Sequence, residues 1–323
     1  MDIIKSDTKI NFLRFSNVAL MLSALVLIAG IVSLSVRGLN FGLDFTGGTL
    51  IELHYPEAPE LSEVRQALEN EGFDEFVVQT FGTARDIVVR IPVGEDGETS
   101  ADVSTRVLET LSGQMANIEM RRVEFVGPQI GQELAEQGGL ALLYVLIGVL
   151  IYISFRFQWR FAVGAVSALV HDVLLVVGVL SIFQVSFDLT VVAAILAVIG
   201  YSLNDTIVVY DRLRENFQTK RKGSPEELTN LSINQMLGRT LMTSLTTLLV
   251  LIALFYFGGE IIHAFAFTLI VGVFVGTYSS VYVAGSMAVK LGVSKMDLMP
   301  VQKEGADQPD TEVLPERFRN RDA

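Results

Sequence analysis

The sequence predicts a polytopic α-helical membrane protein that carries one soluble α+β domain. Half of the 323 residues are apolar and the mean hydropathy is +0.47, which is typical of membrane proteins. Six apolar stretches are long enough to cross a bilayer. The segment 37–137 between the first two stretches holds 12 more acidic than basic residues, which accounts for the whole net charge of −12. The acidity therefore belongs to one soluble domain. Ordinary solubility explains it, and a partner with positive patches is the alternative.

The first membrane helix is predicted at Phe15–Val36, after a polar start that contains Lys5, Lys9 and Arg14. A basic start before an apolar stretch also fits a cleaved signal peptide. The stretch is longer than a usual signal-peptide core and five more spans follow, so a membrane helix is favoured. The other spans are predicted at Gln137–Phe155, Phe161–Phe183, Leu189–Tyr210, Thr240–Phe257 and Ala264–Val289.

The soluble segment reads as alternating strands and helices in the order β-α-β-β-α-β. This order predicts a ferredoxin-like split βαβ domain, large enough to hold its own core. The six elements are predicted at Thr49–Tyr55, Glu60–Glu71, Phe76–Phe81, Ile87–Val93, Ala101–Met115 and Ile118–Val126. The chain thus divides into 1–36 (N-terminus and first helix), 37–137 (ferredoxin-like soluble domain), 138–289 (five-helix bundle) and 290–323, a flexible tail with scattered prolines.

Composition excludes several classes of chemistry. There are no cysteines, so neither a disulfide nor a thiolate site can form. His54, His171 and His263 are far apart in the sequence and show no metal-ligand spacing. Gly47-Gly48 is not followed by the Lys-Ser/Thr of a phosphate-binding loop, and the acidic balance argues against nucleic acid. We expect no enzymatic activity, no cofactor, no metal and no nucleic-acid partner.

The distribution of basic residues predicts the orientation. With the N-terminus inside, the segments 1–14, 156–160, 211–239 and 290–323 are cytoplasmic and carry 3, 2, 6 and 6 basic residues. The short outer loops near Gln184–Asp188 and Gly258–His263 carry no Lys or Arg. Both termini are therefore predicted in the cytoplasm, with the large domain on the outer side.

Asn204 and Asp205 lie inside the fourth predicted membrane helix. An ionised carboxylate at that depth costs about 2.5–3.5 kcal/mol on insertion scales, so it needs a partner or a function. Arg239, at the start of the fifth helix, is expected at a similar depth. A static ion pair and a carboxylate that exchanges protons both remain open. His171-Asp172, near the middle of the third helix, is predicted to be a second, structural polar pair.

The chain contains one six-helix unit without an internal repeat. Complete drug or lipid exporters with such membrane parts need two six-helix units, so a second polypeptide is expected. Gly272 and Gly276 have the spacing that lets helices approach closely, and we expect them at the contact with that partner. Tyr210-Asp211 mimics half of an intramembrane aspartyl protease site, but the Gly-x-Gly-Asp half of such a site does not occur in the sequence.

Three motifs carry a resemblance to a known family. They are LDFTGG at Leu43–Gly48, EFVGPQIG at Glu124–Gly131 and GYSLNDTIVVYDRLRENF at Gly200–Phe217. Together with the arrangement of one helix, a large domain and five helices, they resemble the SecF family of the bacterial SecDF complex, within the resistance-nodulation-division superfamily. The resemblance covers roughly residues 10–295, and the third motif is the most specific of the three.

The resemblance implies a role, site residues and partners. It implies an inner-membrane subunit that uses proton flow to help pull exported proteins out of the SecYEG channel. It assigns proton coupling to Asp205, Arg239 and Asn204, and a family motif to the residues Asp44, Phe45, Thr46, Gly47 and Gly48. The implied partners are a SecD-like six-helix subunit, SecYEG, the unfolded exported polypeptide, YajC and membrane lipid. Half of a proton-driven exporter of small molecules or lipids is the alternative function.

Overall fold

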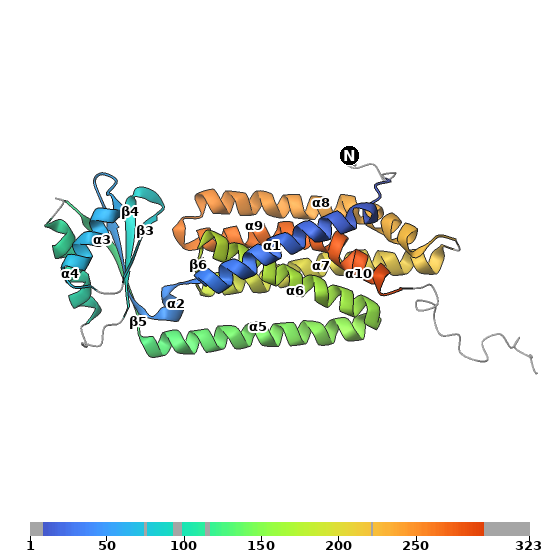
Figure 1. Cartoon of the computed structure of the whole chain (residues 1–323), viewed down its shortest axis with the longest axis horizontal. Coiled ribbons are helices and arrows are strands. Elements are labelled where there is room, and N and C mark those ends of the chain that lie inside the picture. The colour runs from blue at the N-terminus through green and yellow to red at the C-terminus, as the bar shows by residue number, and fades with distance from the viewer. Residues whose placement is uncertain (1–8, 74–75, 93–98, 114–116, 221, 294–323) are drawn as a thin grey trace, which may run out of the picture.

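The computed structural model is elongated, with a small α+β domain at one end of a bundle of long helices (Figure 1). The structure describes residues 9–73, 76–92, 99–113, 117–220 and 222–293. We call the end of the bundle beside the α+β domain the domain end, and the opposite end the far end. The chain crosses between these ends six times.

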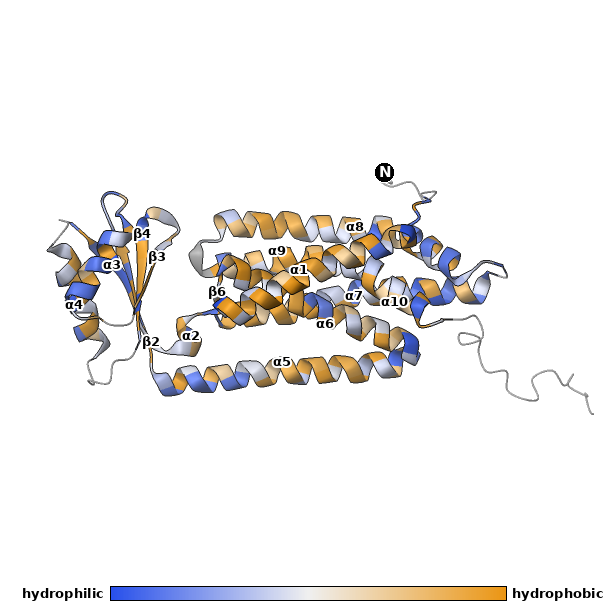
Figure 2. Ribbon diagram, viewed as in Figure 1, coloured by the Kyte–Doolittle hydropathy of each residue, from blue (hydrophilic) through white to orange (hydrophobic). Residues whose placement is uncertain are grey.

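The six predicted spans are confirmed as long apolar helices. Hydrophobic residues dominate their middle parts, whereas polar residues gather at the far end and on the α+β domain (Figure 2). The helices are α1 (Ser16–Arg37), α5 (Pro128–Arg156), α6 (Trp159–Phe183), α7 (Leu189–Thr219), α8 (Pro225–Phe257) and a last span made of α9 (Glu260–Ser279), a π-helical segment (Ser280–Ala284) and α10 (Gly285–Lys290).

The centre of the bundle is formed by α6, α7 and α9. In their most apolar windows 44–56% of the residues are buried, against 11% for α1 and α5. The outer helices therefore present wide apolar surfaces, such as Leu143, Ile147 and Ile151 on α5. A surface of this kind is stable when lipid or another apolar protein surface covers it.

Glycines allow the central helices to approach one another. Gly272 of α9 lies against Val198 of α7, and Gly276 lies 3.0–3.3 Å, measured from an added Cβ, from Ser202. The expectation that these two glycines contact a partner subunit is wrong, because both face α7 of the same chain. A third close approach, between Gly30 of α1 and Gly178 of α6, has no motif that would identify it from the sequence.

Three helices extend beyond the predicted membrane limits. α5 begins at Pro128, inside the segment 37–137 that the sequence assigns to the soluble domain. α7 continues to Thr219, and α8 starts at Pro225 behind a capping box made by Ser224 and Glu227. The segment 211–239, expected to be a polar connection, is therefore largely helical. Hydropathy predicts where a helix leaves the membrane. It does not predict where the helix itself ends, because backbone hydrogen bonds can continue through polar residues.

The α+β domain has the predicted split βαβ arrangement. Four antiparallel strands pair in the order β3-β4-β2-β5, and the helices bury apolar residues such as Leu68 and Val107 on one face of the sheet. The elements are β2 (Gly48–His54), α3 (Leu61–Asn70), β3 (Val77–Phe81), β4 (Thr83–Ile91), α4 (Ser100–Ser112) and β5 (Glu119–Val126).

A second, two-stranded sheet joins the domain to the bundle. β1 (Asn40–Phe41) pairs in parallel with β6 (Ser186–Phe187), which lies between α6 and α7. From β4, the Arg90 guanidinium donates to the Phe41 carbonyl (3.2 Å) and to the Ser186 hydroxyl (3.0 Å). The Arg90 contacts fix the uncovered face of the sheet against the domain end. Two-residue strands separated by more than 140 positions leave no periodic signal in a sequence.

The packing of α9 on α7 leads to a first prediction. Gly272→Leu should destabilise the protein by about 1–3 kcal/mol or more, because the new side chain must displace Val198 from a filled contact. Gly148→Leu is the matched control, since Gly148 lies on an exposed part of α5 with open space around it. Thermal unfolding in detergent measures both variants, and equal stability would contradict the packing described.

The second prediction concerns Asp86, a buried acid of the domain. Burial alone raises its pKa. Hydrogen bonds from Thr83 and His54 and the charge of Arg121 outweigh that effect and hold the pKa below its ordinary value. A lowered pKa in the folded state stabilises the domain above the unfolded-state pKa, and this stability is lost as the pH falls through the folded-state pKa.

Asp86→Asn should therefore lower the free energy of unfolding by about 1–3 kcal/mol at neutral pH. The difference in stability between the variant and the unmodified domain should shrink below about pH 4. There Asp86 becomes protonated and, like an asparagine, carries no charge. Circular dichroism of residues 40–127 during unfolding provides the measurement, with exposed Glu109→Gln as control. A difference that stays constant down to about pH 2 would show that the charge is unimportant.

Candidate functional site

Asp205 is a buried carboxylate on the inner face of α7. Its side chain is 3% exposed, and Ser202 and Val209, one helical turn away on either side, are also buried. Among the described residues, its Oδ2 atom finds no hydrogen-bond donor. Buried polar atoms are nearly always paired, so an unpaired carboxylate oxygen at membrane depth requires an explanation beyond stability.

The guanidinium of Arg239, near the middle of α8, interacts electrostatically with Asp205. Within the described part of the chain the two groups form no ion pair, and Arg239 is itself largely exposed. A static helix-locking salt bridge would hold the charges within 4 Å. The observed arrangement leaves the acid and the cation apart but within electrostatic range.

The structure does not bring Asn204 to this site. Its side chain is exposed on the outer side of α7, because consecutive residues on a helix point about 100° apart. The neighbouring Tyr201 instead faces α8, where its hydroxyl donates to Ser244 (3.2 Å). Ser244 in turn bonds with Thr277 of α9 (2.7 Å). Neutral hydroxyls thus connect α7, α8 and α9 beside Asp205.

His171 and Asp172 of α6 form the predicted polar pair, with a distance of 2.8 Å between His171 Nδ1 and Asp172 Oδ1. The hydroxyls of Ser202 and Ser279 both donate to the other carboxylate oxygen, Oδ2. On the opposite side of the ring, Ser23 of α1 bonds with His171 Nε2. Four helices therefore meet at the His171–Asp172 pair, whose acid is 1% exposed. No pattern in the sequence singles out the three serines.

The last span changes its helical form directly after this cluster. Ser279 ends α9, and the π-helical segment Ser280–Ala284 follows. A π-helical turn leaves the regular i→i+4 ladder. The Ala284 carbonyl accepts a hydrogen bond from Tyr210 Oη at 3.0 Å, and Tyr210 is itself completely buried between α6 and the last span. π-Helical turns occur frequently at functional sites.

The family-motif residues lie at the junction between the domain and the bundle. Asp44, on the short helix α2 (Leu43–Thr46), accepts a hydrogen bond from the first backbone N–H of α7, at Leu189 (3.0 Å). Phe45 packs beside the rings of Phe41 and Phe187. A carboxylate at a helix N-terminus satisfies a free N–H and interacts favourably with the helix dipole.

Gly47 and Gly48 allow the chain to turn from α2 into β2. Both have positive φ values, 66° and 116°, which favour glycine. A Cβ on Gly48 would collide with the carbonyl oxygen of Ile91, and one on Gly131 of α5 would lie 3.1 Å from the Gly47 nitrogen. The motif therefore forms a tight structural joint between the sheet, α5 and α7.

A cavity of ≈ 430 Å³ lies beside this joint, between the uncovered face of the sheet and the domain end. Its lining includes Glu52, Arg122 and Glu124 from the sheet and Asp188 and His263 from the bundle. The Arg122 guanidinium donates to Glu124. The acids and bases that line the cavity come from both the domain and the bundle, so any movement between the two parts would alter it.

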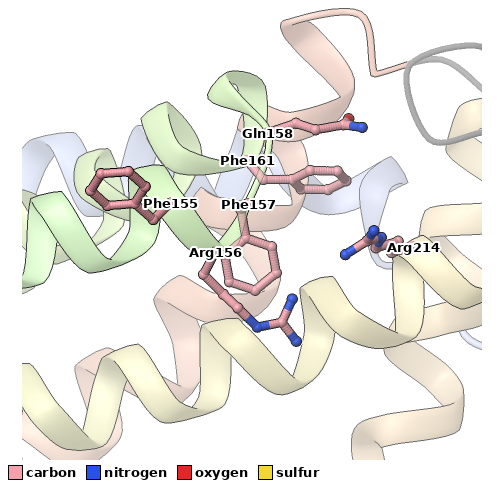
Figure 3. A pocket seen from close by; sticks show the side chains of 6 residues that line it. All are labelled: Phe155, Arg156, Phe157, Gln158, Phe161 and Arg214. Atoms are coloured by element: carbon pink, nitrogen blue, oxygen red, sulfur yellow. The ribbon is translucent and has the colours of Figure 1, made fainter. Parts of the chain in front are cut away.

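A smaller pocket of ≈ 220 Å³ lies at the far end, where α5 turns into α6 (Figure 3). Arg156 pairs with Asp211 of α7 (2.8 Å) and covers the ring of Phe157. Arg214 points into the same space (Figure 3). This pocket ties the α5–α6 turn to α7, and its lining contains no acid or nucleophile.

The histidines and acids do not form a metal site in the part of the chain that the structure covers. No group of three His, Cys, Asp or Glu side chains there could hold an ion. The polar chemistry of the membrane part is concentrated on Asp205 with Arg239, and on Asp172 with His171.

The glycine joint leads to a third prediction. Gly48→Ala should reduce the stability by several kcal/mol, because a positive φ costs about 1–2 kcal/mol and the added Cβ also meets the Ile91 carbonyl. Gly38→Ala is the control, since Gly38 has a positive φ of 69° but open space around it. The yield of folded protein and its thermal unfolding should separate the two variants. Similar losses of stability in both variants would mean that the positive φ alone determines the cost at Gly48, without a contribution from the contact with Ile91.

The sequence matches known family models and known proteins. A family model described as protein export membrane protein SecD/SecF, C-terminal, matches residues 106–294, and the SecD/SecF GG motif matches residues 32–55. Protein translocase subunit SecF of Vibrio alginolyticus is 52% identical over 309 residues, covering 94% of this chain and 98% of the relative. The SecF subunit of Pseudomonas aeruginosa is 50% identical over 293 residues, covering 91% and 95%.

The solved structures agree. The crystal structure of SecDF, a translocon-associated membrane protein from Thermus thermophilus, superposes with a TM-score of 0.80 at 38% identity. The match covers 88% of this chain but 39% of that longer chain. A SecDF structure in a super-membrane-facing form matches with a TM-score of 0.64. On the strength of its two matching family models and of relatives about half identical along nearly their whole length, the chain belongs to the SecF family.

Proposed function

We propose that this chain is an accessory subunit of the Sec protein-export machinery and couples proton flow to late translocation. The observation that carries the proposal is the buried, unpaired carboxylate of Asp205 with Arg239 within electrostatic range. Such an acid can bind a proton when the cation is distant and release it when the cation approaches. Its charge state then depends on the positions of α7 and α8.

The driving force is sufficient for this role. One proton crossing the membrane releases about 2.3 kcal/mol per 100 mV. That energy, with a pH-gradient contribution, biases a two-state element by one or two powers of ten. The α+β domain, fixed to the domain end through Arg90 and Asp44, would carry the resulting movement to the outer side of the membrane.

The proposed partner is a SecD-like six-helix subunit. The matching SecDF chain is more than twice as long as the matched part of it, and the single six-helix unit here exposes broad apolar faces on α1, α5 and α8. We place the far end in the bacterial cytoplasm and the domain in the periplasm, on the distribution of Lys and Arg. SecYEG, an unfolded exported polypeptide and YajC complete the proposed assembly.

The fourth prediction tests the acid and the cation. Asp205→Asn keeps the shape and polarity but cannot titrate, so it should assemble with the partner and lose proton-dependent stimulation of export. Asp205→Glu should retain part of the stimulation, and Arg239→Ala should fail as well. Export into inverted membrane vesicles, with and without a proton gradient, measures the effect, and co-purification checks assembly.

Glu215→Gln is the control, because this acid lies at the exposed far end of α7 and pairs with Arg212. It should leave proton-driven export unchanged. A structural ion pair would give the opposite pattern: Asp205→Asn would destabilise the protein, and whatever assembled would still work. Full proton-driven export by an assembled Asp205→Asn complex would refute the proposed function.

A further inference from the structure

We propose that His171 and Asp172 form a second proton-holding site, which shares one exchangeable proton with Asp205 through the Ser202 hydroxyl. The inference rests on the proposed function and extends it, because that function uses only Asp205 and Arg239. The carboxylate involved lies on a different helix, α6, and is more deeply buried than Asp205.

The groups around Asp172 form hydrogen bonds with its carboxylate, but the hydroxyls among them do not neutralise its charge. Oδ1 bonds with the His171 ring, and Oδ2 accepts the hydroxyls of Ser202 and Ser279, the latter at 2.7 Å. Hydroxyls supply hydrogen bonds but no charge. An isolated charge in a low-dielectric interior is costly even when hydrogen-bonded. An ionised Asp172 beside a neutral His171 is therefore a state of high energy, which a proton on either group relieves.

Among the described residues that face the pair, His171 is the one that can carry a positive charge. α1 contributes Ser23, α7 contributes Ser202, and α9 contributes Ser279 and Tyr278, whose ring stacks on His171 at 6.3 Å. In the described structure no Lys or Arg forms an ion pair with Asp172. On α7, Asp205 follows Ser202 by one helical turn, and Arg239 of α8 interacts electrostatically with Asp205. In its electrically neutral state the pair thus contains one exchangeable proton, on the carboxylate or on the ring, and without that proton it carries one negative charge.

Ser202 lies between the two acids. It precedes Asp205 by three residues on α7, so the two side chains share a helix face with their Cβ atoms about 5–6 Å apart. Its hydroxyl already donates to Asp172, and a hydroxyl can accept a proton while it donates its own. Asp205 Oδ2 has no hydrogen-bond partner among the described residues, so a turn of its carboxyl toward Ser202 breaks no hydrogen bond of this oxygen.

The transfer can be written with every proton placed. The protonated Asp205 carboxyl first turns to donate to the Ser202 oxygen, since the two groups are not hydrogen-bonded in the structure. Its O–H bond then breaks and its proton joins the Ser202 oxygen, while the Ser202 proton moves to Asp172 Oδ2. Asp205 becomes ionised near Arg239, and the Asp172–His171 pair changes from one negative charge to neutral. Rotation of the Ser202 hydroxyl restores the starting arrangement. The total charge is conserved, and the negative charge moves to the acid that has a cation within range.

The same step changes the contacts of α9. A proton on Asp172 Oδ2 occupies part of the acceptor that Ser202 and Ser279 share, so one of the two hydroxyls must turn away. Ser279 borders the π-helical segment, where the backbone ladder is already irregular. Protonation of Asp172 would thereby loosen α9 from α6 at the point where the last span can most readily shift.

Infrared pH-difference spectroscopy of the complex with its partner, in lipid vesicles, tests the site directly. In the unmodified protein both buried carboxyls should contribute to the carbonyl band of protonated acids. Asp172→Asn should remove one contribution and shift the titration midpoint of the other, and Asp205→Asn should do the reverse. A spectrum of Asp172→Asn that matches the unmodified protein throughout the titration would overturn the proposal.

Export assays separate this inference from the function on which it rests. Asp172→Asn should assemble and lose at least tenfold of the proton-driven stimulation, with part of it restored in Asp172→Glu. Retained stimulation in Asp205→Asn would refute the proposed function itself. Loss in Asp205→Asn, with full stimulation and an unchanged pH profile in Asp172→Asn, would refute only the second site.

Ser202→Ala decides the connection, also in the case that Asp172→Asn fails to assemble. It removes the shared hydroxyl while both carboxyls remain, so the stimulation should fall about tenfold and the two infrared titrations should become independent. Ser286→Ala is the matched control, a buried serine whose hydroxyl bonds, in the described part of the chain, to carbonyls of its own span, at Tyr282 and Val283. If Ser202→Ala behaves like Ser286→Ala, the two acids are not connected through Ser202.

Discussion

The need to satisfy Asp172 inside an apolar bundle sets much of the helix arrangement. Neither lipid nor bulk water can solvate that carboxylate at this depth, so donors must come from the protein. They come from α7 and α9, while the His171 ring links the acid to α1. The glycines at 272 and 276 then become necessary, because α9 must lie close to α7 for Ser202 and Ser279 to reach the same oxygen. The close packing of α9 on α7 and the hydrogen bonds to Asp172 therefore depend on each other.

Asp205 lies in the same bundle but, unlike Asp172, is not surrounded by hydrogen-bond donors within the described structure. It is buried to a similar degree, yet one of its oxygens has no partner among the described residues, and Arg239 stays outside ion-pair distance. A fold selected for stability alone would pair or replace such a group. The bundle thus holds two acids at membrane depth, one saturated with donors and one with an open oxygen, and under the proposed function the second is the one that gains or loses a proton. A proton taken up there changes which helices attract one another.

The junction between the bundle and the domain determines how far such a change can travel. Asp44 caps the start of α7, Arg90 ties β4 to β1 and β6, and the Gly47-Gly48 turn is packed against α5 and β4. The helix that carries Asp205 is thus bonded at its domain end to the segment that leads into the sheet. A shift of α7 must either move the domain or break these contacts. The joint therefore connects α7 to the domain through direct contacts.

The sequence by itself determined the six spans, the β-α-β-β-α-β order and the presence of Asp205 and Asp172 at depth, because hydropathy, residue periodicity and charge are local properties of the chain. It also indicated the family motifs, although not that Asp44 caps a helix. Only the tertiary structure decided that Gly272 and Gly276 serve contacts within the chain and that Asn204 points away from Asp205. It also decided that Ser23, Ser202 and Ser279 converge on the His171–Asp172 pair. Those outcomes depend on which faces of distant helices meet, and a serine on an apolar helix looks the same in the sequence whether it faces lipid or a carboxylate.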